Sequence, residues 1–238
     1  MSKDTTIRIN KRIKDLGLAS RREADTFLEK GFVLVNGKAA VLGQQVSEAD
    51  VIEIKKINRN YKYYLFNKPK GVVSHSPQYE EKEVKDFFTN FEKDGLTIVG
   101  RLDKHSEGLM LITNDKRLVE RILKPEYAHE RQYMVDVQEK ISNNMVRLFE
   151  KGFTVKDRFF AKPAIVEILS PFSFSITLTE GKKHQIRLMA NELHYTVSRL
   201  QRVRIMNLKL GVMREGTKRD LTQSEKTKLL SNIGLREI

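Results

Sequence analysis

The chain of 238 residues contains no cysteine. Disulfide bonds and thiolate metal sites are therefore excluded, and the interior must be held together by packing and hydrogen bonds. The first residues, MSKDTTIRINKR, lack the apolar stretch of a secretory signal, and no uncharged apolar run approaches the length that spans a bilayer. We expect a cytoplasmic protein that has no contact with a membrane.

The usual signatures of bound metals and nucleotides are also missing. The five histidines, at positions 75, 105, 129, 184 and 194, form no helical pair and have no clustered carboxylates at metal-ligand spacing. There is no glycine-rich phosphate loop, and Gly71, Gly100 and Gly108 are better explained as turn residues. We predict no metal site, and we find no internal repeat or low-complexity tract.

Positive charge is what the sequence has in excess. Lys and Arg number 44 against 31 Asp and Glu, which gives a formal net charge of +13. Such an excess attracts polyanions, so nucleic acid is the leading partner. Hydrophobic residues make up 39% and charged residues 32% of the chain, a balance that predicts a globular protein. The length favours one domain of ordinary size and a smaller one.

The first 55 residues have the pattern of two helices and a small sheet. Apolar residues from Ile7 to Leu16 recur at helical spacing, and Ser20 with Glu23 forms a capping box that opens a second helix. The segment from Phe32 to Val41 alternates around Asn36-Gly37, a dipeptide typical of a two-residue hairpin turn, and Val51 to Ile54 is a further strand.

Basic residues gather at the start of this small domain. The first 22 residues contain seven Lys or Arg and two acidic residues, and Arg21 with Arg22 begins the second helix, where phosphate is attracted by side chains and helix terminus alike. A solvated charged face is the alternative explanation. With LGLASRREADTFLEKGFVLVNGK at its centre, the segment from Ile7 to Ile54 resembles the S4-type RNA-binding domain. We assign residues 1–55 to this domain and the polar residues 56–61 to a linker.

Residues 62–238 alternate between strand and helix patterns and predict one larger domain. Expected strands are Tyr63–Phe66, Thr97–Val99, Leu109–Thr113, Tyr133–Val137 and Phe172–Thr179, and expected helices are Lys116–Leu123, Ser142–Lys151, Gln185–Leu193 and one capped by Thr222 and Glu225. The fold class is therefore α+β: a small S4-type α/β domain followed by a mixed α+β domain.

One loop between apolar strands places a carboxylate, Asp103, between the cations Arg101 and Lys104, which favour its ionised form. Alone, this pattern is more often a structural ion pair. The full string GRLDKHSEGLMLITND, however, resembles the catalytic motif of the pseudouridine synthases of the small-subunit and large-subunit ribosomal RNA type. That family has a mainly antiparallel sheet in its catalytic domain, and the resemblance makes Asp103 the catalytic carboxylate.

Further segments follow in the order that the family has them. They are NKPKG from Asn67, Tyr133 within HERQYMV, GKKHQIRLM from Gly181, and RLQRVRIMNLKLG from Arg199. Among the branches of the family, the chain is most similar to the large-subunit synthases designated F, chiefly through Arg199 to Leu208. Two positions depart from the family: Arg131 stands where a lysine is common, and Leu188 replaces a second arginine after Arg187.

The resemblance also implies a chemistry. Conversion of uridine to pseudouridine breaks the bond between base and ribose, rotates the uracil and rejoins it through carbon 5, which needs no electron or energy donor, so we expect no cofactor. A carboxylate can attack the sugar or the base, or take a proton from the ribose, and the sequence leaves these routes open. By family likeness Arg187 pairs with Asp103, and Tyr133 stacks on the uracil and helps to remove the carbon 5 proton.

Besides the catalytic residues, we predict a set of basic residues that contact the RNA backbone. They are Arg21, Arg22, Lys68, Arg101, Lys182, Lys183, Arg199, Arg202 and Arg204. The expected partner is ribosomal RNA, with 23S RNA favoured over 16S RNA or a transfer RNA, and the expected state is a monomer. Two alternatives are a non-catalytic RNA-binding or ribosome-assembly protein and an RNA methyltransferase with the same binding domain.

Overall fold

The computed structural model describes residues 6–55 and 60–237. The expected linker, 56–61, therefore lies largely outside the described residues. The N-terminal part contains these elements: β1 (Ile7–Arg8), α1 (Ile9–Asp15), α2 (Arg21–Glu29), β2 (Val33–Val35), β3 (Lys38–Ala39), β4 (Gln45–Val46) and β5 (Ile52–Ile54).

This part folds around its own small core. Strands β3, β2 and β5 form one antiparallel sheet, β1 pairs with β4, and both sheets pack with the helices around Ile9, Ile13 and Val33. The predicted capping box is confirmed, because the Glu23 amide donates to Ser20 Oγ and the Ser20 amide donates to Glu23 Oε2. Asn36 and Gly37 both have positive φ angles, of 49° and 78°, as the hairpin prediction requires.

The larger part is built on one long sheet. Its strands are β6 (Tyr63–Lys68), β7 (Thr97–Val99), β8 (Glu107–Thr113), β9 (Arg131–Val137), β12 (Ile165–Ser170), β13 (Ser173–Leu178), β14 (Val197–Ile205), β15 (Leu208–Lys209) and β16 (Lys218–Asp220). Outside this sheet, β10 (Phe153–Val155) and β11 (Phe159–Ala161) form a separate hairpin. The helical elements are α3 (Lys116–Leu123), α4 (Asn143–Lys151), α5 (Gln185–Glu192), α6 (Gln223–Asn232) and the 3₁₀ turns η1 (Val84–Phe87) and η2 (Pro125–Tyr127).

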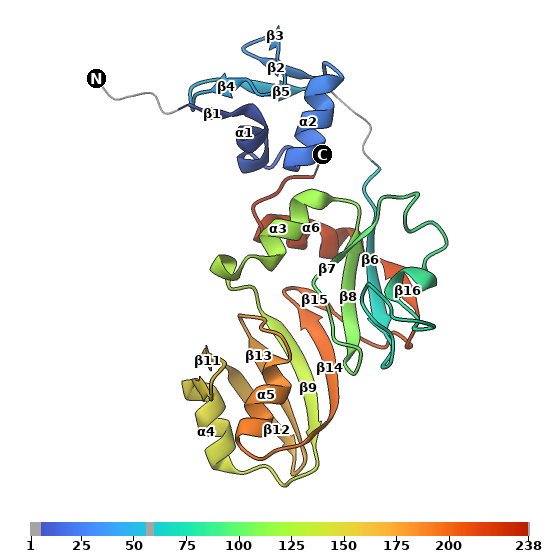
Figure 1. Ribbon diagram of the computed structural model, residues 1–238, viewed down its shortest axis with the longest axis vertical. Coiled ribbons are helices and arrows are strands. Elements are labelled where there is room, and N and C mark those ends of the chain that lie inside the picture. Colours follow the sequence, from blue (N-terminus) through green and yellow to red (C-terminus); the bar gives the residue numbers. More distant parts are fainter. Residues whose placement is uncertain (1–5, 56–59, 238) are drawn as a thin grey trace, which may run out of the picture.

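Strand order along the sheet is β12-β13-β9-β14-β8-β6-β16, with β15 beside β14 and β7 beside β8. Among the described strands of this sheet only β14 and β8 pair in parallel, and every other pairing is antiparallel. The predicted α+β class and mainly antiparallel sheet are thus confirmed. The parallel junction divides the sheet into two halves, each with its own helices (Figure 1).

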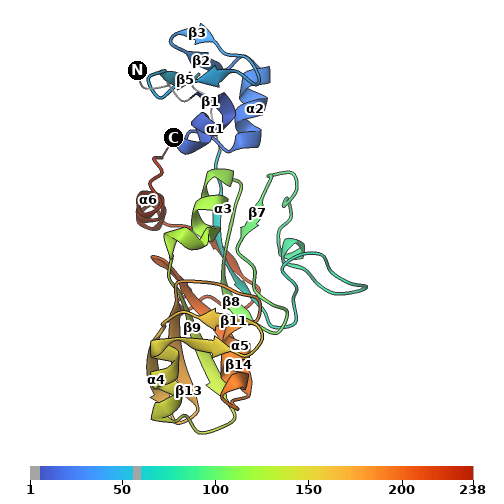
Figure 2. The same cartoon turned by 60° about the vertical axis from the view of Figure 1, so that its left-hand side comes forward.

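Each half has a separate apolar core. Helices α3 and α6 cover β6 and β8 around Leu65, Leu111 and Leu118, while α4 and α5 cover β9 and β13 around Phe149 and Phe174. Figures 1 and 2 both place α3 and α6 between the sheet and the N-terminal part. No described helix is long and apolar enough to cross a membrane.

Direct contacts join the N-terminal part to α3. Lys14 Nζ donates to Glu120 Oε1 at 2.6 Å, and the buried Arg117 donates from Nη1 to the Gly17 carbonyl at 3.2 Å. Arg121 Nη2 reaches the Asp15 carbonyl at 3.4 Å. These bonds hold the end of α1 and the start of the loop that follows it against α3.

Candidate active site

A cleft of 870 Å³ opens beside the parallel junction of the long sheet. Its walls come from the loop 100–106 between β7 and β8, from β9 and β14, and from residues 178–186 at the start of α5. The site is therefore assembled from segments that lie far apart in the sequence.

Asp103 lies in the loop 100–106, which is fastened on both sides of it. Ser74 Oγ donates to the Leu102 carbonyl at 2.6 Å and accepts from the Leu102 amide at 3.0 Å, while Leu102 itself is buried in the apolar core. On the other side the Ser106 amide donates to the Asp103 carbonyl at 3.0 Å. The Asp103 side chain, 36% exposed, thus projects into the cleft from a fixed backbone.

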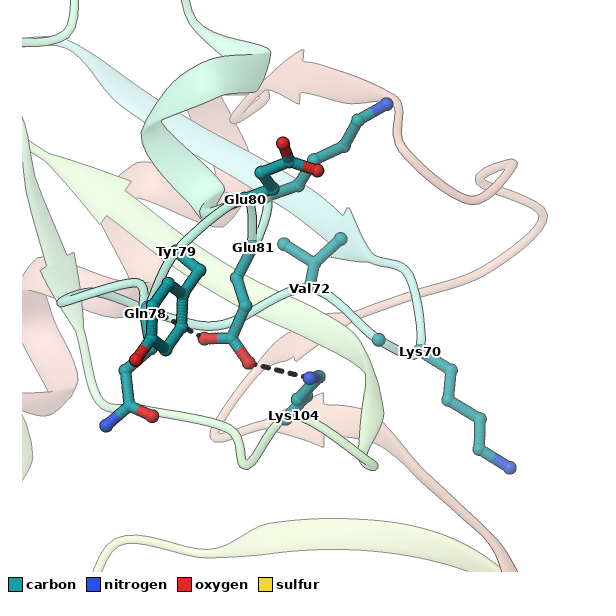
Figure 3. A pocket seen from close by; sticks show the side chains of 9 residues that line it. Lys70, Val72, Gln78, Tyr79, Glu80, Glu81 and Lys104 are labelled. Carbon is teal, nitrogen blue, oxygen red and sulfur yellow. Dashed lines mark hydrogen bonds and ion pairs between the residues drawn. The ribbon is translucent and has the colours of Figure 1, made fainter.

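The cations next to Asp103 in sequence form no ion pair with it in the described structure. Arg101 is exposed, and Lys104 turns away to the Glu81 carboxylate at 2.6 Å, on the wall of a second pocket of 620 Å³ (Figure 3). The ion-pair partner found for Asp103 in the described chain is His184, whose Nδ1 lies 3.3 Å from Oδ2. His184 carries positive charge only when it is protonated.

His184 is a residue that sequence reasoning missed as a partner of the carboxylate. It precedes α5 with a φ of +56°, a left-handed conformation that is uncommon for a residue other than glycine. No motif spacing relates position 184 to position 103, because the contact depends on how α5 is placed against the loop.

Arg187 lies next to the cleft but makes no direct ion pair with Asp103 in the described structure. Its Nη2 donates to the His105 carbonyl at 2.8 Å and its Nη1 to the Val197 carbonyl at 3.0 Å. Burial lowers the pKa of Arg187, and the charge of Asp103 opposes that shift. The expected direct pairing is therefore corrected: Arg187 acts on Asp103 through space and fastens the loop that carries it.

Tyr133 lines the cleft from the middle of β9. It pairs across the sheet with Ile176 of β13 on one side and with Arg202 of β14 on the other. The half-buried ring packs against the core under α4 and α5 and against a further apolar cluster that includes Phe66 and Met110. This packing holds the ring while leaving part of it open to the cleft, which suits an aromatic platform.

Buried cations surround the same region. Lys68 is fully buried, donates to the carbonyls of Pro69 and Val72, and has its pKa lowered to about 8, mainly by burial. Burial also lowers the pKa of Arg131, which lines the cleft, and Arg202 is 2% exposed there. The cleft is consequently a positively charged surface in which a single anionic group would be strongly attracted.

The predicted RNA-contacting residues divide into three groups by exposure and pairing. Exposed members are Arg21, Arg22, Arg101 and Lys183, and members engaged in ion pairs are Lys182 with Glu180, Arg199 with Glu107 and Arg204 with Glu130. Lys68 and Arg202 are buried, so the expectation of a surface backbone contact is corrected for these two. Lys and Arg are usually exposed, so the sequence did not indicate that these two side chains would be buried.

Arg21 and Arg22 open α2 and line a hollow of 210 Å³ between the two parts of the chain. Lys116 and Arg121 of α3 line it from the other side.

Within the described residues no group of three or more acidic or histidine side chains could hold a metal ion.

Comparison with known families matches two segments of the chain. The model described as RNA pseudouridylate synthase matches residues 62–192, and the S4 domain model matches residues 7–52. Together the two segments contain the cleft loop, Tyr133, Arg187 and the basic start of α2.

Individual proteins are similar over nearly the whole chain. The dual-specificity RNA pseudouridine synthase RluF of Escherichia coli strain K12 is 36% identical over 231 residues, which cover 94% of this chain and 79% of that protein. Ribosomal large subunit pseudouridine synthase B of Bacillus subtilis strain 168 is 32% identical over 233 residues, covering 93% and 95%. A crystal structure of a pseudouridylate synthase superposes with a TM-score of 0.70 at 29% identity, covering 94% of this chain and 99% of that one.

Proposed function

We propose that this chain isomerises a specific uridine of 23S ribosomal RNA, with Asp103 as the catalytic carboxylate. The chain belongs to the RNA pseudouridylate synthase family and is a pseudouridine synthase. The observation that carries the proposal is the cleft, which is lined by Asp103, by the ring of Tyr133 and by the buried Arg202. A binding module would need neither a fixed carboxylate nor such a pocket.

The reaction needs a group that can act on the ribose or the base. The bond between N1 of uracil and C1′ of ribose breaks, the uracil turns, a bond forms between C5 and C1′, the proton on C5 leaves and N1 takes up a proton. An ionised carboxylate can begin this sequence as a nucleophile at the sugar or the base, or as a base that takes a ribose proton. Asp103 has the exposure and the fixed backbone for each of these routes.

Tyr133 and Arg187 complete the proposed site. The Tyr133 ring can stack on the uracil, and its hydroxyl can assist removal of the C5 proton. Arg187 supplies positive charge near Asp103 and holds the loop through the His105 carbonyl. A uridine within structured RNA must be turned out of its stack to reach these groups.

Residues 1–55 are proposed as the RNA-binding domain, joined by the linker 56–61 to the catalytic domain 62–238. The exposed Arg21 and Arg22 would contact phosphates from α2, and Arg101 and Lys183 would contact them at the cleft mouth. The similarity to ribosomal large subunit pseudouridine synthase B supports large-subunit RNA as the target, and the dual specificity of RluF supports a second target, for which a transfer RNA is our candidate.

The deciding experiment is Asp103→Asn, which keeps the shape of the side chain and removes its charge and basicity. We expect tritium release from carbon-5-labelled uridine in RNA to be abolished, while the melting temperature and RNA affinity change little. Asp220→Asn, which alters an exposed carboxylate on β16, is the matched control. An active Asp103→Asn enzyme, or activity that falls only in proportion to unfolded protein, would reduce Asp103 to a structural residue.

The target is tested separately by mapping pseudouridine in total RNA from cells with and without this gene. Loss of a site in 23S RNA is the expected result. Loss confined to 16S or transfer RNA would overturn the choice of target without affecting the assignment of Asp103.

A further inference from the structure

Arg202 is a buried arginine whose hydrogen bonds are incomplete. It lies on β14 with 2% of its surface exposed, and it lines the cleft. Its Nε donates to the Leu109 carbonyl at 2.8 Å and its Nη1 to the Arg101 carbonyl at 3.4 Å, while Nη2 is buried with no hydrogen-bond partner in the described structure.

Among the described residues, no carboxylate forms an ion pair with this guanidinium. Its neighbours on β14 do have such partners: Arg199 pairs with Glu107, and Arg204 pairs with Glu130. A buried charge without a counter-ion is costly, and a buried donor without an acceptor adds to that cost. An apolar residue on β14 would avoid both. The arrangement therefore indicates an acceptor that arrives from outside the chain.

Two neighbouring residues, Tyr133 and Ser106, indicate where that acceptor lies and what kind of group it is. Arg202 lies directly across the sheet from Tyr133, the proposed stacking platform, so its guanidinium is beside whatever the ring covers. Ser106, on the loop that carries Asp103, also lines the cleft and has a buried Oγ without a partner at 1% exposure. A charged donor and a hydroxyl, both without a hydrogen-bond partner, therefore line the same cleft.

We propose that Arg202 Nη2 donates to a carbonyl oxygen of the target uracil, with Ser106 Oγ as a second contact to the same base edge. The proposal rests on the proposed function, because it takes the cleft around Asp103 to hold the target uridine. The edge of uracil presents O4, N3–H and O2 in turn, so a donor and a hydroxyl can pair with adjacent positions.

The contact also has a chemical consequence. When the bond from C1′ to N1 breaks, its electron pair stays with the uracil and spreads from N1 onto O2 and O4. A positive group already in place beside one of these oxygens is bound more strongly by the departing base than by the intact nucleotide. Arg202 would then lower the barrier rather than merely hold the substrate.

A purely structural role makes a different prediction. Arg202 joins the carbonyls of Arg101 and Leu109, which flank the loop of Asp103, so its loss could simply displace that loop. Such a displacement would slow the reaction of every uridine analogue by the same factor. A contact to one oxygen would be sensitive to the atom at that position.

The test compares RNA transcripts that contain uridine, 2-thiouridine or 4-thiouridine, each labelled with tritium at carbon 5. The transcript is a piece of 23S RNA or a transfer RNA, whichever the wild-type enzyme modifies. Single-turnover tritium release is measured for wild type, Arg202→Gln and Arg202→Lys. We expect Arg202→Gln to lower the rate about 10- to 100-fold at saturating RNA with little change in RNA Kd. For each analogue we divide the rate with uridine by the rate with the thiouridine. Because sulfur accepts hydrogen bonds weakly, this ratio should be much lower in Arg202→Gln than in wild type for one of the two analogues and the same in both enzymes for the other.

Equal ratios in wild type and Arg202→Gln for both analogues would overturn the proposal and leave the loop-fastening role. Ser106→Ala removes one buried oxygen atom and supplies a second test if the arginine variants do not fold: we expect slower turnover with an unchanged melting temperature, and normal turnover would remove Ser106 from the base edge. Arg147→Gln, on the exposed surface of α4, controls for the loss of one charge. Failure of the proposed function is recognised independently, by an active Asp103→Asn enzyme.

Discussion

Gly108 should be the most demanding backbone position at the parallel junction beside the cleft, and Gly108→Ala tests this directly. It lies on β8 opposite Arg202 at the parallel junction, with a φ of +106°. A Cβ atom there would lie 2.3 Å from the Arg202 carbonyl oxygen and 2.8 Å from the Arg202 nitrogen. Both are backbone atoms, which cannot move aside as the end of a side chain can.

Two costs add for this substitution. The unusual φ costs about 1 to 3 kcal/mol for a residue with a side chain, and forcing an extra carbon into a packed site costs about 1 to 3 kcal/mol more. Gly71→Ala is the matched control, because its φ is +89° and nothing lies within 4 Å of the added Cβ. The difference between the two variants, about 1 to 3 kcal/mol, isolates the clash with β14.

Urea denaturation of both variants and the wild type measures these free energies of unfolding. For a chain of this size the difference corresponds to melting temperatures about 2 to 12 °C apart, with Gly108→Ala the lower. Catalytic rate should fall further in Gly108→Ala than in Gly71→Ala, because the displaced β14 carries Arg202. Equal destabilisation by the two substitutions would refute the argument from close strand approach.

Two further predictions concern the aromatic platform and an ion pair far from it. Tyr133→Phe should bind RNA normally but turn over slowly or stall, whereas Tyr133→Ala should also weaken binding of the flipped base. Normal turnover by the Phe variant, in the tritium assay, would restrict the residue to stacking. Hydrogen bonds from Arg219 at 2.7 Å lower the pKa of Glu225 to about 2. Since the folded-state pKa lies below the unfolded one, this stabilisation is complete above about pH 4.5 and lost as the pH falls towards 2. Arg219→Gln should therefore destabilise the protein at pH 7, and its deficit relative to wild type should shrink between pH 4.5 and 2. A deficit that is constant over this range in thermal melts would mean that the pair contributes nothing through charge.

Local chemistry explains why much of the fold was predictable. Helix starts at Ser20 and Thr222 were found because their capping boxes satisfy free amides with residues three positions away. The helix Lys116–Leu123 was predicted with the observed bounds. By contrast β12, β14 and the β10–β11 hairpin were not predicted as strands, because β12 and β14 do not follow a simple alternation and β10 and β11 are only three residues long.

The candidate site was predictable only as far as its motifs extend. The loop of Asp103 and the strand of Tyr133 were located because each belongs to a segment of specific sequence. Contacts between segments were not: His184 beside Asp103, and the burial of Lys68, depend on how distant elements pack. A side chain's charge predicts exposure on average, and the exceptions arise where tertiary structure surrounds a cation with packed elements.

The parallel pairing of β8 and β14 explains why the cleft lies where it does. Glu107 pairs with Gln201 and Gly108 with Arg202, and on β8 these two residues follow directly after the loop of Asp103. Because the two strands run in the same direction, the chain that follows β8 cannot return to β14 through a tight turn, and residues 114–196 must intervene. Those intervening residues include Tyr133, His184 and Arg187, so one long connection both closes the sheet and brings the platform and the cations to Asp103. Changes at the junction should therefore affect catalysis more than equal changes at the outer strands β12 or β16.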